Sequence, residues 1–252
     1  MSLLVASDIS KSFAGIQALA DVSLDIDSNE IVGLIGPNGA GKTTFFNCLL
    51  GIIRPDTGHV RFDGRELTNV PTYKRARFGI ARTFQRIELF TGMTPREHFI
   101  VADRAHSGTG SLWKDLLFLG RPTRGEEERS QQVIDLLGLG PLADRRVESL
   151  SLGTGRLVEI GRALMTRPKL VLLDEPSSGL DRTETDELAA TLRNVQHDSG
   201  IAILLVEHDV DLVRNLVGRV FVLDFGMMIA SGPTQDVFAD SAVRQAYLGD
   251  LV

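Results

Sequence analysis

Nine consecutive residues near the N-terminus have the types and order of a phosphate-binding loop. They are Gly36, Pro37, Asn38, Gly39, Ala40, Gly41, Lys42, Thr43 and Thr44. The apolar residues 31–35 before them predict a short buried strand, and residues 43–50 after them predict a helix. A strand, a glycine-rich turn, Gly-Lys-Thr and a helix together form the P-loop arrangement.

The chemistry of this loop follows from its residue types. Gly36, Gly39 and Gly41 permit backbone conformations closed to residues with a Cβ atom, so successive N–H groups can surround an anion at the positive end of the helix. Lys42 can reach the β- and γ-phosphates, and the Thr43 hydroxyl can bind Mg²⁺. The full motif in this context disfavours the alternative, a glycine-rich turn that contains a lysine by chance.

Two adjacent carboxylates follow a second apolar run. Residues 170–173 predict a buried strand that leads into Asp174 and Glu175. Ligands of α/β folds bind at the carboxyl ends of parallel strands. We therefore expect Asp174 to hold Mg²⁺, directly or through water, and Glu175 to orient or deprotonate the water that attacks the γ-phosphate. The alternative is a solvated turn.

One histidine, like the two carboxylates, comes after an apolar run that predicts a strand. His208 follows the apolar residues 201–206, which predicts that it reaches the same sheet edge and contacts the γ-phosphate. The remaining histidines have no such placement and are predicted to serve packing or to lie on the surface; they are His59, His98, His106 and His197. No cluster has the spacing of a zinc site.

Residues 150–155 predict a second anion-binding helix terminus. Ser151 is predicted to be the N-cap, and Gly153 and Gly155 would expose backbone N–H groups at the helix start. Because the P-loop already serves this chain's own nucleotide, we expect this motif to serve the nucleotide of another chain. Two copies would then pair head to tail.

The elements that must position these residues form an α/β pattern. Apolar runs alternate with amphipathic helices, which predicts a largely parallel sheet covered on both faces. Residues 3–9 and 21–27 predict strands, the second antiparallel and half-solvated. Phe13 lies between them; on the residue alone, a core position is favoured over stacking on a nucleotide base.

A mostly helical insertion is predicted for residues 86–149, where the composition changes. Thr94 is predicted to be the N-cap of a helix with Pro95 in its first turn, and residues 126–137 predict an amphipathic helix. Phe90, Met93 and Phe99 could dock a partner if they were exposed.

The amino-acid composition argues against several classes of protein. The chain has 252 residues, of which 43% are hydrophobic and 24% charged, a typical balance for a soluble globular protein. A net charge of −6 argues against a protein that coats nucleic acid. The single cysteine, Cys48, excludes an internal disulfide and is predicted to be a buried structural thiol. We see neither a signal peptide nor an apolar run long enough for a membrane span.

Taken together, the motifs resemble those of the ATP-binding subunit of an ABC transporter. Residues 36–43 look like Walker A, residues 150–155 the signature motif, residues 170–175 Walker B and residues 177–181 the D-loop, while Gln85, His208 and Phe13 look like the Q-loop, H-loop and A-loop residues. The resemblance implies a P-loop NTPase (RecA-like) core with an N-terminal antiparallel β subdomain and an inserted α-helical subdomain. Residues 1–85 and 150–232 would form the core, 86–149 the insertion and 233–252 short C-terminal helices.

The resemblance also implies site roles, with ATP and Mg²⁺ as cofactors. Thr43, Asp174 and Gln85 would hold the metal; Glu175, His208, Gln85 and Lys42 would act in hydrolysis. Phe13 becomes an expected adenine platform, and Ser151, Gly153 and Asp181 would contact the nucleotide across a pair of chains. Leu152 and Thr154 depart from the usual Leu-Ser-Gly-Gly-Gln signature, but Ser151 and Gly153 remain, so we expect activity.

A narrower likeness concerns residues 43–51, 79–85, 157–163 and 246–249, which look like importers of branched-chain or other hydrophobic amino acids. Urea and amide importers share much of this pattern. The likeness implies a second ATPase chain, transmembrane permease subunits and, indirectly, a solute-binding protein, with this chain at the cytoplasmic face of the membrane and no nucleic-acid partner. Soluble ABC ATPases are the rival class, but they usually carry long coiled coils or tandem cassettes. A P-loop kinase or GTPase would not explain the signature-like motif or His208.

Overall fold

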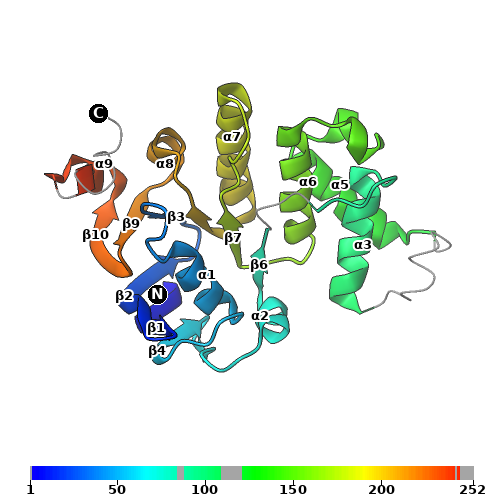
Figure 1. The fold of residues 1–252 in the computed structure, drawn as a ribbon. Coiled ribbons are helices and arrows are strands. Elements are labelled where there is room, and N and C mark those ends of the chain that lie inside the picture. Colours follow the sequence, from blue (N-terminus) through cyan, green and yellow to red (C-terminus); the bar gives the residue numbers. More distant parts are fainter. Residues whose placement is uncertain (1, 84–87, 109–120, 242, 245–252) are drawn as a thin grey trace.

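The computed structural model describes residues 2–83, 88–108, 121–241 and 243–244. Its strands form two sheets (Figure 1). The strands are β1 (Ser2–Phe13), β2 (Ile16–Asp27), β3 (Ile31–Ile35), β4 (Thr57–Phe62), β5 (Arg65–Glu66), β6 (Ile80–Arg82), β7 (Leu170–Asp174), β8 (Ala202–Val206), β9 (Arg219–Asp224) and β10 (Met227–Pro233).

The helices cover these sheets and extend beyond one end of them (Figure 1). They are α1 (Lys42–Leu50), α2 (Thr72–Phe78), α3 (Pro95–Ser107), α5 (Arg124–Leu136), α6 (Leu152–Leu164), α7 (Arg182–Ser199), α8 (Val210–Leu216) and α9 (Thr234–Ala239), with short 3-10 turns at Gly140–Leu142 and Val147–Ser149.

The larger sheet has six strands in the order β10-β9-β3-β8-β7-β6, and all neighbours are parallel except the edge pair β9–β10. Its inner strands bury both faces. In β7, Val171 and Leu173 join one core while Leu170 and Leu172 join the other. This alternation explains why the first four residues of the strand, 170–173, are all apolar, and it confirms the predicted parallel sheet covered on two sides.

The smaller sheet is antiparallel, in the order β2-β1-β4-β5. Its inner residues, such as Ile9 and Val60, share a core with Phe45 and Leu49 of α1. The predicted strand over residues 3–9 was too short. β1 continues to Phe13, which pairs with Ile16 across a two-residue turn in which both residues have positive φ. The residues near this hairpin are polar or exposed, so they lack the apolar face that would have indicated a longer strand.

Helices α3, α5 and α6 lie together beyond β6 (Figure 1). Two of the aromatic and apolar residues considered as docking residues are in fact buried: Phe99 is fully buried and Met93 is 5% exposed, while Phe90 is 56% exposed. Thr94 caps α3 as predicted, with Glu97 completing a capping box. This start turns Phe99 toward α6, where the ring lies so close to Gly161 that a Cβ atom there would be 2.3 Å away.

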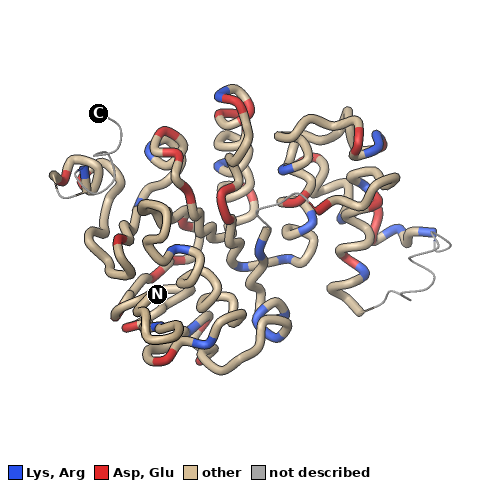
Figure 2. Tube along the Cα trace, viewed as in Figure 1, with Lys and Arg blue, Asp and Glu red and all other residues tan. Residues whose placement is uncertain are grey.

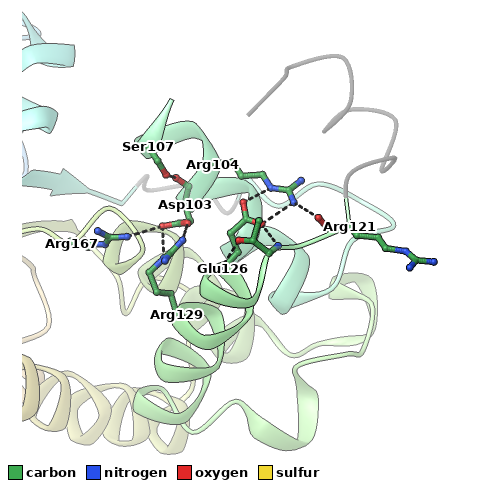
Figure 3. A network of polar contacts seen from close by, with 8 residues as sticks. Asp103, Arg104, Ser107, Arg121, Glu126, Arg129 and Arg167 are labelled. Atoms are coloured by element: carbon green, nitrogen blue, oxygen red, sulfur yellow. Dashed lines mark hydrogen bonds and ion pairs between the residues drawn. The ribbon is translucent and has the colours of Figure 1, made fainter. Parts of the chain in front are cut away.

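Helix α5 begins at Arg124, two residues before the predicted start. Thr123 and Glu126 form a capping box, a Thr-x-x-Glu pattern that the sequence carries. The Glu126 carboxylate also accepts hydrogen bonds from Arg104 of α3, at 2.7 Å from Nε and 3.0 Å from Nη2 (Figure 3). Beside this pair, the buried Asp103 accepts from Arg129 and Arg167. These contacts fasten α3 to α5 and to the segment after α6.

The Arg104–Glu126 ion pair should make the free energy of unfolding depend on pH. The hydrogen bond from Arg104 lowers the pKa of Glu126 from 4.5 to about 2. Because the folded pKa is depressed, the stabilisation is complete above about pH 5 and is lost as pH falls from 4.5 toward 2. We expect Glu126→Gln to lower the free energy of unfolding at pH 6 by about 3 kcal/mol. Urea unfolding should show this difference shrinking toward pH 3.

The matched control for this prediction is Glu128→Gln. Glu128 pairs with Arg124 on the surface of the same helix, and such exposed pairs contribute about 0–1 kcal/mol. A difference between wild type and Glu126→Gln that stays constant from pH 6 to pH 3 would contradict the assigned ion pair.

Candidate nucleotide-binding site

The P-loop lies between β3 and α1, as its sequence predicts. Two of its glycines are required by close approaches. A Cβ atom on Gly36, at φ 153°, would lie 2.0 Å from the Leu223 carbonyl oxygen, and one on Gly41, at φ 101°, would lie 2.7 Å from the Ala18 oxygen. The loop is also fixed by the β9–β10 turn, because the Gly226 N–H donates to the Ala40 oxygen at 2.9 Å.

Lys42 is buried at the first position of α1, and its ammonium lies inside the loop. Nζ donates to the carbonyl oxygens of Gly36, at 2.6 Å, and Pro37, at 3.0 Å. Burial lowers the pKa of Lys42, and the carboxylates of Glu175 and Asp174 oppose this shift. The loop thus holds a cation beside the N-terminus of α1, where Thr43 is exposed and Thr44 half-buried.

Asp174 and Glu175 stand at the carboxyl end of β7. Asp174 is the last residue of the strand and pairs with Val206 of β8. Burial, and then the charge of Glu175, raises the pKa of Asp174. Glu175 adopts a left-handed conformation at φ 46°, and its N–H donates to the Val206 oxygen at 2.8 Å. Both carboxylates thus stand at the end of β7, beside the end of β8.

His208 lies at the same sheet edge, after β8. Its Nδ1 atom is 3.8 Å from Oε1 of Glu175, and its side chain is 57% exposed. The other histidines show no comparable position. His98, for example, is buried in the helical part, where Nε2 accepts from the Phe90 N–H at 2.9 Å and Nδ1 lies 2.9 Å from the Thr94 oxygen. Burial lowers the pKa of His98, which suits these packing contacts.

The motif at residues 150–155 lies at the start of α6. Ser151 is its N-cap, as predicted, and its hydroxyl accepts from the Thr154 N–H at 3.2 Å. The two hydroxyls of Ser151 and Thr154 are also 3.2 Å apart. Gly153 donates its N–H to Glu184 at 3.3 Å, and Glu184 completes the capping box of Asp181 at the start of α7. This motif and Asp181 therefore form one surface.

Phe13 is 45% exposed at the end of β1, so it is not the core residue that its type alone favours. Lys11 Nζ lies 5.5 Å from its ring centroid.

Asn38 and Gly39 are exposed at the tip of the P-loop. Gln85 lies outside the described residues. Cys48 is fully buried, as predicted, and burial raises the pKa of its thiol to about 11.

A cleft of about 810 Å³ lies between α2 and β6 on one side and α3 and α6 on the other, and no sequence pattern predicts it. Its lining includes Arg77, Arg82, Arg162 and Glu159, and Figure 2 marks basic residues along α2 and β6. Arg75 also lines the cleft, but its guanidinium is buried and donates to backbone carbonyls, including Cys48 and Leu67. Burial lowers the pKa of Arg75 to about 10.

Within the part of the chain that the structure describes, no group of three or more metal-ligating His, Cys, Asp or Glu side chains occurs. None of the helices there is long and apolar enough to cross a membrane.

A largely parallel sheet with a P-loop after β3 and paired carboxylates at the end of β7 defines the class of P-loop nucleotide-binding proteins. The sequence profile of the ABC transporter family matches residues 19–178. This chain therefore belongs to the ABC transporter family, and it is an ATP-binding and ATP-hydrolysing subunit of such a transporter.

Relatives with known names support the assignment. The high-affinity branched-chain amino acid transport ATP-binding protein BraF of Pseudomonas aeruginosa is 37% identical over 98% of both chains. The lipopolysaccharide export system ATP-binding protein LptB of Haemophilus influenzae is 33% identical over 99% of this chain and 98% of that protein. The crystal structure of the ADP conformation of MJ1267, an ATP-binding cassette of an ABC transporter, has a TM-score of 0.85 at 32% identity and covers 99% of both chains.

Proposed function

We propose that this chain hydrolyses MgATP with Lys42, Asp174, Glu175, His208 and Gln85. The observation that carries the proposal is the gathering of Lys42, Asp174, Glu175 and His208 at the carboxyl ends of β3, β7 and β8, with His208 3.8 Å from Glu175. Lys42 binds the phosphates, Glu175 takes the proton of the attacking water, and His208 contacts the γ-phosphate.

Mg²⁺ fits the residues at this edge. The exposed Thr43 hydroxyl and the Asp174 carboxylate are hard oxygen donors of the kind that Mg²⁺ prefers, and Gln85 would add an amide oxygen. When bound, the ion would neutralise charge on the β- and γ-phosphates. Phe13, exposed at the hairpin end, would stack on the adenine ring.

The signature-like surface serves a second chain in this proposal. Ser151, Gly153 and Asp181 would contact the ATP held by the P-loop of a partner ATPase, which is either an identical chain or a related one. The support is that α6 begins at the N-cap Ser151, because the N-terminus of a helix favours a negatively charged group. Residues 1–85 and 150–232 would act as the nucleotide-binding core and residues 86–149 as the part that follows the permease.

We further propose that the transporter is an importer of branched-chain or other hydrophobic amino acids. The support is the likeness to BraF over nearly the full chain. A transmembrane permease would dock at the cytoplasmic face, in the cleft between α2 and α3, and a solute-binding protein would deliver the solute. The alternatives are a urea or amide importer and a soluble ABC ATPase; the likeness to LptB adds an export system.

Mass spectrometry of a tagged copy purified from gently solubilised native membranes tests this proposal. We expect integral membrane subunits, a second ATPase chain and a solute-binding protein. Ribosomal or DNA-repair partners without a membrane subunit would contradict transport, and lipopolysaccharide-export subunits would contradict import. Both results would leave the ATP chemistry standing.

A further inference from the structure

Glu207 is a fully buried acidic residue beside the proposed catalytic groups. It directly follows β8, a strand whose residues are all buried and apolar, and its side chain is 0% exposed. Burying a carboxyl group in such surroundings costs several kcal/mol unless donors satisfy its oxygens. A carboxylate buried at this position therefore requires hydrogen-bond donors around both of its oxygens.

Four donors surround this carboxylate. Oε1 accepts from the backbone N–H of Ser177, at 2.9 Å, and from its hydroxyl, at 2.7 Å. Oε2 accepts from the backbone N–H groups of His208, at 3.0 Å, and Asp209, at 3.4 Å. All four partners donate, so the arrangement matches a group that only accepts hydrogen bonds.

The two oxygens hold two different chain segments. Ser177 lies two residues after Glu175, in the turn that leaves β7, and its side chain is also buried. His208 and Asp209 leave β8 and lead into α8, which Asp209 caps. Glu207 thus joins the segment that carries Glu175 to the segment that carries His208, close to the 3.8 Å approach between Glu175 Oε1 and His208 Nδ1.

We propose that Glu207 is a positioning residue for ATP hydrolysis, which fixes Glu175 and His208 relative to each other. The inference rests on the roles proposed above for those two residues. Its physical basis is that the backbone bond from the Glu175 N–H to the Val206 oxygen is followed by two segments without strand pairing, and hydrogen bonds to one buried carboxylate hold these segments together. A shift of about 1 Å in catalytic groups can reduce a rate by about 100-fold.

Glu207→Gln tests the inference with little change in volume. A glutamine keeps one acceptor oxygen but turns an NH₂ group toward the other pair of donors. We expect kcat to fall at least about tenfold per folded molecule, while the Kd for ATP changes less than about twofold, because the P-loop contacts remain. The matched control is Glu126→Gln, a buried glutamate in α5, which should change stability but not kcat per folded molecule.

Ser177→Ala keeps the inference testable if Glu207→Gln folds poorly. It removes only the hydroxyl donor at 2.7 Å and should lower kcat several-fold. In the double variant of Glu207→Gln and Ser177→Ala, the serine substitution should lower kcat little further, because its effect acts through Glu207. Similarly, Glu207→Gln should lower kcat little further when it is added to His208→Ala.

Three results would overturn the inference: an unchanged kcat in both Glu207→Gln and Ser177→Ala, a loss of ATP affinity as large as the loss of kcat, or fully additive effects with His208→Ala. These are distinct from failure of the proposed catalytic roles. If Glu175→Gln and His208→Ala both hydrolyse ATP at wild-type rates, those roles are wrong. If those variants are impaired and Glu207→Gln is normal, only the positioning role is wrong.

Discussion

Replacing Glu175 with glutamine should reduce kcat for ATP hydrolysis by about 100-fold to 1,000-fold and leave ATP affinity nearly unchanged. Glutamine has the same shape and can keep the turn at φ 46° and the backbone bond to Val206. It cannot accept a proton from water, so only the chemical step is affected. Steady-state phosphate release and equilibrium binding of a fluorescent ATP analogue would measure the two quantities separately.

A matched control is Glu187→Gln, because Glu187 is exposed on α7, away from the sheet edge. It should hydrolyse ATP at the wild-type rate. Near-normal steady-state hydrolysis by Glu175→Gln would show that another group activates the water, and the assigned role of Glu175 would be wrong.

The second large effect is expected at the P-loop. Lys42→Met should weaken ATP binding by about 10-fold to 100-fold, since a hydrogen bond to a charged group contributes about 1.5–3 kcal/mol. Methionine keeps much of the buried stem of Lys42 but removes the ammonium that bonds the Gly36 and Pro37 oxygens. Isothermal titration with ATP would measure the loss, and a melting curve would check folding.

Lys169→Met serves as the comparison for Lys42→Met. Lys169 pairs with Asp63 on the surface and should not influence nucleotide binding. ATP affinity within about twofold of wild type in Lys42→Met would contradict a phosphate-binding role for this lysine.

Local patterns in the sequence determined most of the fold and of the proposed site. The Gly-rich run between an apolar strand and a helix, and the apolar runs that end at Asp174 and near His208, depend on neighbouring residues only. For that reason β3, α1, β7 and β8 lie where the sequence predicts them. The N-caps Thr94 and Ser151 could also be predicted, since each side chain accepts a hydrogen bond from a backbone N–H in the first turn of its own helix.

Exposure and contacts between distant segments were decided only by the tertiary structure. Phe99 and Phe13 are both aromatic, yet one fills the space beside Gly161 and the other stands exposed at a hairpin end. Likewise, nothing local to Glu207 indicates that Ser177, 30 residues away, donates two hydrogen bonds to it. Such contacts depend on which strands become neighbours. The parallel pairing of β7 with β8 brings the ends of both strands to one edge, and this pairing assembles the site.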